Sequence, residues 1–334
     1  MKNKNKVFIV AEVGNNHEGN YLIAKKLILE AKKCGADAVK FQTFIPESFV
    51  SIKDLKKISQ LKKFQLSFNE FKSLSSYSKK IGIKFFSTPF DIQSARFLKK
   101  IQSVFKISSS DNDFYPLLNE VASFNKHIFL STGLADLNDI SKSKKIIFKN
   151  WKKKRIKNKK LILLHCVTSY PVKPEEANLK AITTLKQKFK DCTIGYSDHT
   201  IGITACISAV ALGARVVEKH FTLNKNYSSF RDHKISADPA EMRDMISKIR
   251  DLEFMLGNGI KNLQKSEKLI VNILRRKAVA NVSIKKGSKI KTNNLKWVRA
   301  NHGFSIQENY KILKAKAKRH IQKNEIIQKK HLKN

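Results

Sequence analysis

The stretch GYSDHTIGITACISAVALGARVVEKHFTL at residues 195–223 contains the pattern that decides the fold. It includes the end of a short apolar run over residues 193–197, a helical pattern over 203–212 that stops at Gly213, and a second apolar run over 216–222. Nearly continuous apolar runs are typical of strands covered on both faces of a parallel sheet. A helix between two such runs predicts a strand–helix–strand unit of an α/β protein.

The same alternation occurs eight times along the chain. The other expected strands cover residues 7–13, 38–43, 83–88, 104–108, 127–132 and 161–167. Further helical patterns lie at 23–34, 68–81 and 240–255, and that at 68–81 follows a capping box formed by Ser67 and Glu70. Eight units within about 255 residues predict a (β/α)8 TIM barrel.

A doubly wound open sheet is the alternative architecture. In that fold a GxGxxG fingerprint commonly follows the first strand. Here the residues after the first expected strand read Gly14-Asn15-Asn16-His17, which does not match. The barrel is therefore favoured.

The pattern changes after residue 258. Residues 1–258 are expected to form the barrel, and a polar, helical connector follows at 259–274. Residues 275–334 contain short strand-like pieces and a turn at Lys286-Gly287, which predict a small, mostly irregular and β module. A module of this size does not comfortably hold a catalytic core alone, so we expect it to dock on another surface.

The composition is strongly basic, with a formal net charge of +40. Most basic residues are Lys spread along the chain, whereas nucleic-acid-binding proteins more often show clustered Arg with interleaved aromatics. The densest run, at residues 152–160, lies between two apolar segments and is interpreted as a solvated loop. Nucleic acid is not an expected partner, but a basic background favours an anionic substrate.

The four cysteines show no CxxC spacing, so they are expected to be reduced thiols. The apolar run after the basic N-terminus is too short for a signal sequence, and no stretch approaches the length of a membrane span. We therefore expect a soluble, cytoplasmic protein without a membrane partner.

Polar residues stand at the carboxyl end of every expected strand, where TIM barrels build their active sites. In chain order they are Glu12, Lys40 with Gln42, Ser87 with Thr88, Lys106 with Ser109, Ser131 with Thr132, His165 leading to Tyr170, Ser197-Asp198-His199 and Glu218-Lys219-His220. A Ser-Thr pair alone can be a plain turn or cap. A Lys inside an apolar strand must reach solvent or meet an anion, so Lys40 and Lys106 favour an anion site.

His199 and His220 end neighbouring late strands, so their imidazoles can share a divalent ion with open positions for substrate and water. Glu12 is a strand carboxylate without a sequence-local cation, for which a purely structural role is the alternative. Cys166 beside His165 is not favoured as a nucleophile and base, because adjacent strand residues point to opposite faces. Two lysines, several hydroxyls and a His-bound metal together match the chemistry of phosphoenolpyruvate.

These residues lie in motifs that resemble the sialic acid synthases. The matching pieces are AEVGNNHEG from Ala11, VKFQT from Val39, FFSTPFD from Phe85, FKISSSD from Phe105, LSTGLA from Leu130, LHCVTSYP from Leu164, GYSDHTIG from Gly195 and ALGARVVEKHFTL from Ala211. The resemblance covers nearly the whole chain. It implies condensation of phosphoenolpyruvate with an acetamido-sugar aldehyde and loss of phosphate by carbon–oxygen cleavage.

The resemblance also implies roles for single residues. It assigns phosphoenolpyruvate contacts to Lys40, Thr88, Lys106, Ser109, Ser131 and Ser197. It assigns sugar contacts to Gln42, Tyr170, Asp232 and Arg299, and proton transfer or sugar orientation to Glu12 and Glu218. His199 and His220 are the implied ligands of manganese or magnesium. Thr168 stands where the family often has Asn, and Arg231 is an addition beside Asp232.

The tail IKKGSKIKTNNLKWVRANHGFS resembles the antifreeze-like (SAF) domain that ends these synthases. In the family this domain covers the barrel mouth of the partner in a domain-swapped homodimer and supplies an arginine to the acetamido group. The residue at that place is Arg299, and the usual Lys-Arg-Pro-Gly reads Val298-Arg299-Ala300-Asn301 here.

The acceptor sugar stays open at this stage. N-acetylneuraminate synthase, which uses N-acetylmannosamine, is the leading expectation, and a legionaminate or pseudaminate synthase using a diacetamido-trideoxy hexose is the alternative. A synthase of seven- or eight-carbon sugar-phosphate acids is a second enzyme reading. A carbohydrate- or nucleic-acid-binding protein without catalysis is a further class, which the complete set of strand-end residues disfavours.

Overall fold

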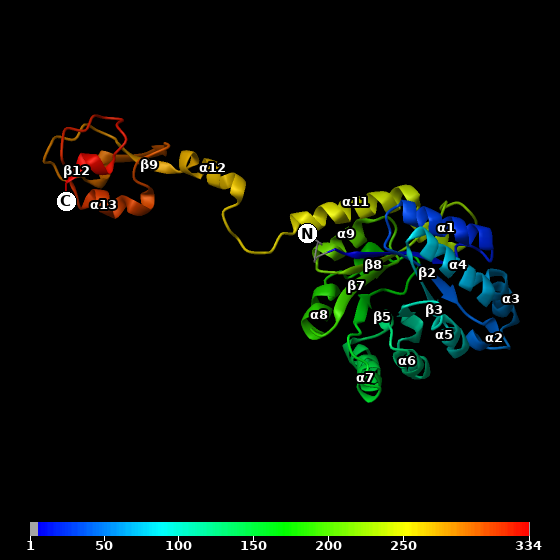
Figure 1. Ribbon diagram of the computed structural model, residues 1–334. Coiled ribbons are helices and arrows are strands. Elements are labelled where there is room, and N and C mark those ends of the chain that lie inside the picture. Colours follow the sequence, from blue (N-terminus) through cyan, green and yellow to red (C-terminus); the bar gives the residue numbers. More distant parts are fainter. Residues whose placement is uncertain (1–5, 334) are drawn as a thin grey trace. The chain divides into compact units, whose positions relative to one another are not determined.

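Eight parallel strands form the centre of the first of two units (Figure 1). The structure, a computed structural model, describes residues 6–333; the first unit ends at Gly257 and the second begins at Asn258. The strands are β1 Phe8–Gly14, β2 Ala38–Thr43, β3 Lys84–Pro89, β4 Val104–Ile107, β5 His127–Ser131, β6 Leu161–His165, β7 Thr193–Asp198 and β8 Val216–His220.

The sheet has the order β3-β2-β1-β8-β7-β6-β5-β4, and β3 also lies beside β4. The strands therefore close nearly completely into a barrel, as the alternating pattern predicts, and the open doubly wound sheet is excluded. The register places Glu12 opposite both Lys40 on β2 and His220 on β8, and Ser197 opposite Glu218. The charged strand ends consequently lie at one level of the barrel.

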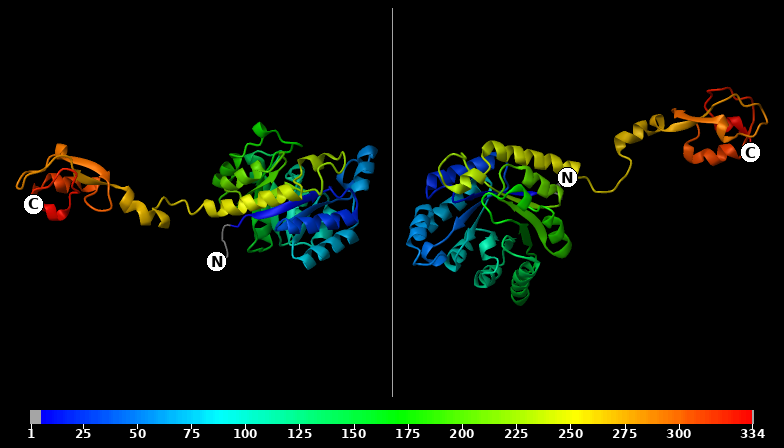
Figure 2. Two further views of the ribbon diagram at one scale, coloured as in Figure 1. Left: turned by 90° about the horizontal axis from the view of Figure 1, so that it is seen from above. Right: turned by 180° about the vertical axis from the view of Figure 1, so that it is seen from behind.

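Helices surround the barrel, and Figure 2 shows them around the sheet from two further directions. They are α1 Tyr21–Lys33, α2 Pro46–Phe49, α3 Leu55–Phe64, α4 Phe68–Ile81, α5 Ile92–Leu98, α6 Tyr115–Ala122, α7 Leu137–Lys153, α8 Ala181–Lys188, α9 Thr204–Ala211, α10 Arg231–Ile235 and α11 Pro239–Met255. The capping box of Ser67 and Glu70 starts α4, and Gly82 ends it in the left-handed conformation. Helix α1 begins earlier than predicted because the Asn20 side chain caps it.

Alternate strand residues fill two separate apolar layers. One set packs between the strands and the helices, for example Ile9, Phe41 and Leu163. The other fills the barrel interior and includes Val10, Ala38, Phe86, Phe129, Ile162, Leu164 and Val216. This inner set forms an apolar floor beneath the polar strand ends.

Strands β6 and β8 end two residues before their predicted ends. Strand β6 stops at His165, and the carbonyl of Val167 beyond it accepts a hydrogen bond from the His199 ring at 2.8 Å instead of a ladder bond. Strand β8 stops at His220, after which Phe221 pairs with Ala237 only as an isolated bridge. Apolar runs alone do not show where side chains take over the backbone hydrogen bonds.

The second unit is small and built from short pieces. It contains α12 Lys265–Leu274, β9 Arg276–Ala280, β10 Leu295–Arg299, α13 Asn309–Leu313, β11 Lys316–Ala317 and β12 Leu332–Lys333. Strands β9 and β10 are antiparallel, and a separate core including Ala278, Ile290 and Ile321 lies within this unit. Within residues 6–333 we find no helix with both the length and the apolar character needed to span a membrane.

Candidate active site

A cavity of about 730 Å³ opens at the carboxyl ends of the strands. The predicted site residues that line it are Glu12, Lys40, Gln42, Thr88, Lys106, Ser109, Ser131, Tyr170, Ser197, His199, Glu218, His220 and Asp232. Arg299 belongs to the second unit, where it is exposed at the end of β10. The barrel thus brings side chains from residues 12–232 to one rim.

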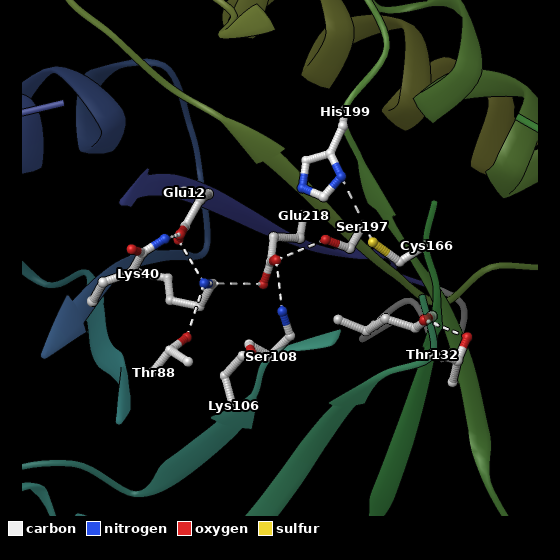
Figure 3. A network of polar contacts seen from close by, with 12 residues as sticks. Glu12, Lys40, Thr88, Lys106, Ser108, Thr132, Cys166, Ser197, His199 and Glu218 are labelled. Atoms are coloured by element: carbon white, nitrogen blue, oxygen red, sulfur yellow. Dashed lines mark hydrogen bonds and ion pairs between the residues drawn. The ribbon is translucent and has the colours of Figure 1, made fainter. Parts of the chain in front are cut away.

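Two lysines and two glutamates form a buried charge network in this cavity (Figure 3). Lys40 Nζ lies 2.8 Å from Glu12 Oε2 and donates to Thr88 Oγ1 at 3.0 Å. Lys106 Nζ lies 2.9 Å from Glu218 Oε1, and the Ser197 hydroxyl donates to the same oxygen at 2.8 Å. Lys40 also lies 3.8 Å from Glu218 Oε2, which joins the two pairs into one network.

The two carboxyl groups have different protonation behaviour. Burial, reinforced by Glu218, raises the pKa of Glu12 to about 7, although Lys40 lowers it. Burial also acts to raise the pKa of Glu218, but Lys106 and Lys40 outweigh this effect and hold that pKa at about 2. Glu12 can therefore exchange a proton near neutral pH, while Glu218 stays ionised and orients the lysines.

Two hydroxyl groups of the cavity lining have no hydrogen-bond partner among the described residues. Ser131 Oγ and Thr168 Oγ1 are buried without a hydrogen-bond partner among the described residues, and both side chains line the cavity. A β-carbon added to Gly133 would lie 2.4 Å from Thr168 Oγ1 and 2.7 Å from Ser109 Oγ. Glycine at position 133 therefore leaves room for the hydroxyls of Thr168 and Ser109 beside its backbone. Free hydroxyl donors in a cavity that also contains two lysines are suited to phosphate or carboxylate oxygens.

His199 and His220 lie side by side in the cavity, with ring centroids 5.3 Å apart. His199 donates from Nδ1 to the Val167 carbonyl, which leaves the lone pair of its Nε2 free. The Nδ1 of His220 is buried and has no hydrogen-bond partner within residues 6–333. Burial lowers the pKa of both imidazoles, so both are neutral at pH 7.

This imidazole pair fits a divalent metal ion. Neutral rings, one of them fixed through its other nitrogen by a backbone carbonyl, are the usual form of metal-binding histidines. No group of three or more His, Cys, Asp or Glu side chains arranged to hold an ion occurs within residues 6–333. Two imidazoles alone would leave open positions on such an ion for substrate or water.

His165 faces away from the cavity, where its Nε2 lies 2.9 Å from the Ala177 carbonyl oxygen. Cys166 does line the cavity, and its sulfur lies 3.7 Å from His199 Nδ1. That nitrogen is already engaged by Val167, and burial raises the pKa of the Cys166 thiol. The geometry thus supports no nucleophile–base pair at this position.

Aromatic side chains also contribute to the lining of the cavity. Tyr170 packs on His199 with centroids 4.3 Å apart, and the Arg231 guanidinium lies 4.4 Å from the Tyr170 ring. The Arg231 Nε also lies 3.2 Å from Asp232 Oδ1. The apolar side chains of the lining, which form an aromatic wall, are Phe49, Leu61, Phe64, Phe90 and Phe230.

Comparison with known proteins identifies the family. The NeuB family model matches residues 27–261, and the SAF domain model matches residues 275–333. The chain belongs to the NeuB family. The resemblance seen in the strand-end motifs and in the tail is confirmed.

Relatives of this NeuB family chain are synthases of sialic-acid-type acids. It is 40% identical to the N,N'-diacetyllegionaminic acid synthase of Campylobacter jejuni over 96% of this chain and 99% of the relative. It is 33% identical to the N-acetylneuraminate-9-phosphate synthase of Mus musculus, over 85% and 81% of the two chains. The chain is therefore an enzyme of this synthase type.

A solved structure of the family has the same fold. The N-acetylneuraminic acid synthetase of Leptospira borgpetersenii, crystallised with citrate, is 36% identical and has a TM-score of 0.74. The match covers 80% of this chain and 90% of that one.

Several residues at the NeuB-type site were not predicted. Asn15 lines the cavity and donates to Gln42 at 3.0 Å, and Glu18 accepts hydrogen bonds there from Ser228 and His233. The aromatic wall was missed as well. The asparagine run after the first strand was a usable signal, because it follows a strand end, whereas the aromatic residues come from helices and loops.

Proposed function

We propose that this protein condenses phosphoenolpyruvate with a 2,4-diacetamido-2,4,6-trideoxy hexose, in the manner of an N,N'-diacetyllegionaminic acid synthase, with manganese or magnesium. The observation that carries the proposal is one cavity with two buried lysines, two glutamates of opposite protonation behaviour and two neutral imidazoles. Phosphoenolpyruvate combines the phosphate and carboxylate that such lysines bind, and an enol that can attack an aldehyde.

Lys40 and Lys106 would hold the two anionic groups of phosphoenolpyruvate, with the hydroxyls of Ser131 and Thr168 supplying further donors. Without substrate the lysines pair with Glu12 and Glu218. An anion that draws Lys40 away from Glu12 removes a charge that lowers the pKa of Glu12, so substrate binding favours the protonated carboxyl. Binding of phosphoenolpyruvate is thus expected to favour uptake of a proton by Glu12.

In the proposed reaction, carbon 3 of phosphoenolpyruvate bonds to the aldehyde carbon while Glu12 donates its proton to the aldehyde oxygen. Water then adds to carbon 2 and returns one proton to the Glu12 carboxylate. The bond from carbon 2 to the bridging oxygen breaks, the new hydroxyl on carbon 2 becomes the keto oxygen, and its proton leaves with the phosphate. His199 and His220 would hold a divalent ion, which supplies Lewis acidity when bound. Glu218, which stays ionised, keeps Lys106 oriented toward the anion.

The aromatic wall supports a diacetamido-trideoxy acceptor. Such a sugar carries two acetamido methyl groups and a C6 methyl, whereas N-acetylmannosamine carries hydroxyls at two of these places. Burying one methyl-sized group against Phe or Leu stabilises a complex by about 0.8 kcal/mol. The 40% identity to the Campylobacter jejuni N,N'-diacetyllegionaminic acid synthase, against 33% to the Mus musculus N-acetylneuraminate-9-phosphate synthase and 36% to the Leptospira borgpetersenii N-acetylneuraminic acid synthetase, supports the same choice. The leading expectation from the sequence is an N-acetylneuraminate synthase, and the proposal departs from it here.

We also propose a domain-swapped homodimer in which Arg299 of one subunit contacts the sugar bound by its partner. Arg299 is exposed in the second unit and available to bind an acetamido carbonyl, and the SAF domain match supports the family arrangement for that unit.

An acceptor panel tests this proposal. With phosphoenolpyruvate and manganese, we expect kcat/KM for 2,4-diacetamido-2,4,6-trideoxymannose to exceed that for N-acetylmannosamine by about tenfold or more, because hydrophobic pockets discriminate by such factors per group. Phosphate release and the product mass measure this directly. A preference for N-acetylmannosamine would restore the N-acetylneuraminate reading, and a preference for arabinose 5-phosphate would indicate a sugar-phosphate synthase. Absence of phosphate release with every sugar would contradict the proposal.

A further inference from the structure

Asp198 and Lys219 form an ion pair in the layer between the barrel and its helices. Lys219 Nζ lies 2.7 Å from Asp198 Oδ2, and the two side chains are 1% and 0% exposed, Lys219 first. The two residues are directly opposite each other in the β7–β8 ladder. Each immediately precedes an imidazole of the cavity, His199 or His220, so the pair is the last outward-facing rung before these rings.

The surroundings satisfy this pair almost completely. Asp198 Oδ1 accepts from the Tyr196 hydroxyl at 2.8 Å and from the Thr200 amide at 2.9 Å. Asp198 Oδ2 also accepts from the Cys206 thiol at 3.4 Å, and Lys219 donates to the Thr200 carbonyl at 2.5 Å. Because Cys206 lies on α9, the cluster connects both strands, the loop after β7 and the covering helix.

An ion pair at this place is not explained by stability. The preceding outward-facing residues, Tyr196 and Val217, belong to the apolar core. An apolar pair at positions 198 and 219 would often be as stable as the buried ion pair. A buried pair does specify geometry, because only one register of β7 against β8 gives each charge its partner. The pair therefore fixes the relative positions of the two strand ends.

The two imidazoles depend on that register. The His199 ring is held through its hydrogen bond to Val167, but the Nδ1 of His220 has no hydrogen-bond partner among the described residues. The position of the His220 ring thus depends on the backbone at the end of β8 and on ring packing against His199 and Tyr170. A slip or splay of β7 against β8 would change the separation of the two rings.

We infer that Asp198 and Lys219 are positioning residues that hold His199 and His220 at the separation needed to share a divalent ion. This inference rests on the proposed metal ligation. Neither residue lines the cavity, so neither contacts substrate or ion. Residues that orient metal ligands typically change metal affinity by 10- to 100-fold when replaced.

The test is manganese binding to metal-free protein, measured without turnover by the electron paramagnetic resonance signal of free Mn²⁺. The main variant is D198N/K219M, which leaves no unpaired buried charge and is therefore expected to fold. We expect its Kd for Mn²⁺ to rise by roughly 10- to 100-fold. K219M alone leaves Asp198 unpaired, so it should unfold at lower urea than the double variant, while its manganese affinity stays similarly weak.

Glu253→Gln is the matched control. Glu253 is 3% exposed, pairs with Arg250 at 2.7 Å and accepts from the Val7 amide, which precedes β1 and so lies away from the strand ends of the cavity. It should lower stability without changing the Kd for Mn²⁺. If D198N/K219M binds manganese like the wild type, or if Kd follows urea stability across all three variants, the inference is wrong. If the wild type itself binds no manganese, the metal assignment fails first, and this inference fails with it.

Discussion

Replacing Lys106 by methionine is expected to lower kcat/KM for phosphoenolpyruvate by on the order of 10³. Methionine keeps much of the length of the side chain but removes the charge that pairs with Glu218 at 2.9 Å. The variant loses a cation for the substrate and leaves Glu218 with the hydrogen bond from Ser197 and with Lys40 at 3.8 Å. Phosphate release at varied phosphoenolpyruvate concentration measures the effect.

Lys100→Met is the control for this substitution, since Lys100 is an exposed lysine after α5 and outside the cavity. It should leave kcat/KM unchanged. Equal activity of Lys106→Met and wild type would contradict the assignment of Lys106 to the anion site.

Replacing His220 by alanine is expected to abolish the manganese response. After removal of metal with a chelator, adding Mn²⁺ should restore turnover of the wild type but leave the variant lower by on the order of 10³, because loss of Lewis-acid chemistry removes several kcal/mol of transition-state stabilisation. His199→Ala should behave alike, since both rings are neutral and lie 5.3 Å apart. Turnover against Mn²⁺ concentration is the measurement.

An exposed histidine of the second unit, His302, provides the control. His302→Ala should recover with manganese as the wild type does. Full metal-dependent turnover in either His199→Ala or His220→Ala would show that the imidazole pair does not hold the ion.

The barrel could be predicted well because its signals are local. Strand β2 and helix α4 begin and end where the apolar run and the capping box predict. The strand-end rule also brought the lysines, glutamates and imidazoles of the cavity to attention, because parallel strands in a barrel present their carboxyl ends at one face. Errors in the fold concern single ends, such as Val167, whose carbonyl accepts from a histidine ring.

The pairing inside the site could not be predicted. Lys106 and Glu218 are separated by 112 positions in sequence, and nothing local indicates that they meet at 2.9 Å. Glu12 has no cation nearby in sequence, and its partner Lys40 comes from the neighbouring strand. The aromatic wall was missed for a similar reason. Phe64 ends α3 and Phe230 precedes α10. Their ring centroids lie 4.9 Å apart, and this packing depends on how the loops fold at the barrel mouth.

The most direct test uses phosphoenolpyruvate with oxygen-18 in the bridge between carbon 2 and phosphorus, together with manganese and 2,4-diacetamido-2,4,6-trideoxymannose. Mass spectrometry then follows the label into phosphate or into the keto acid. The proposed reaction breaks the carbon–oxygen bond, so the released phosphate should carry the label and the nine-carbon keto acid should not. Label retained in the keto acid, or phosphate released without a nine-carbon product, would contradict the account.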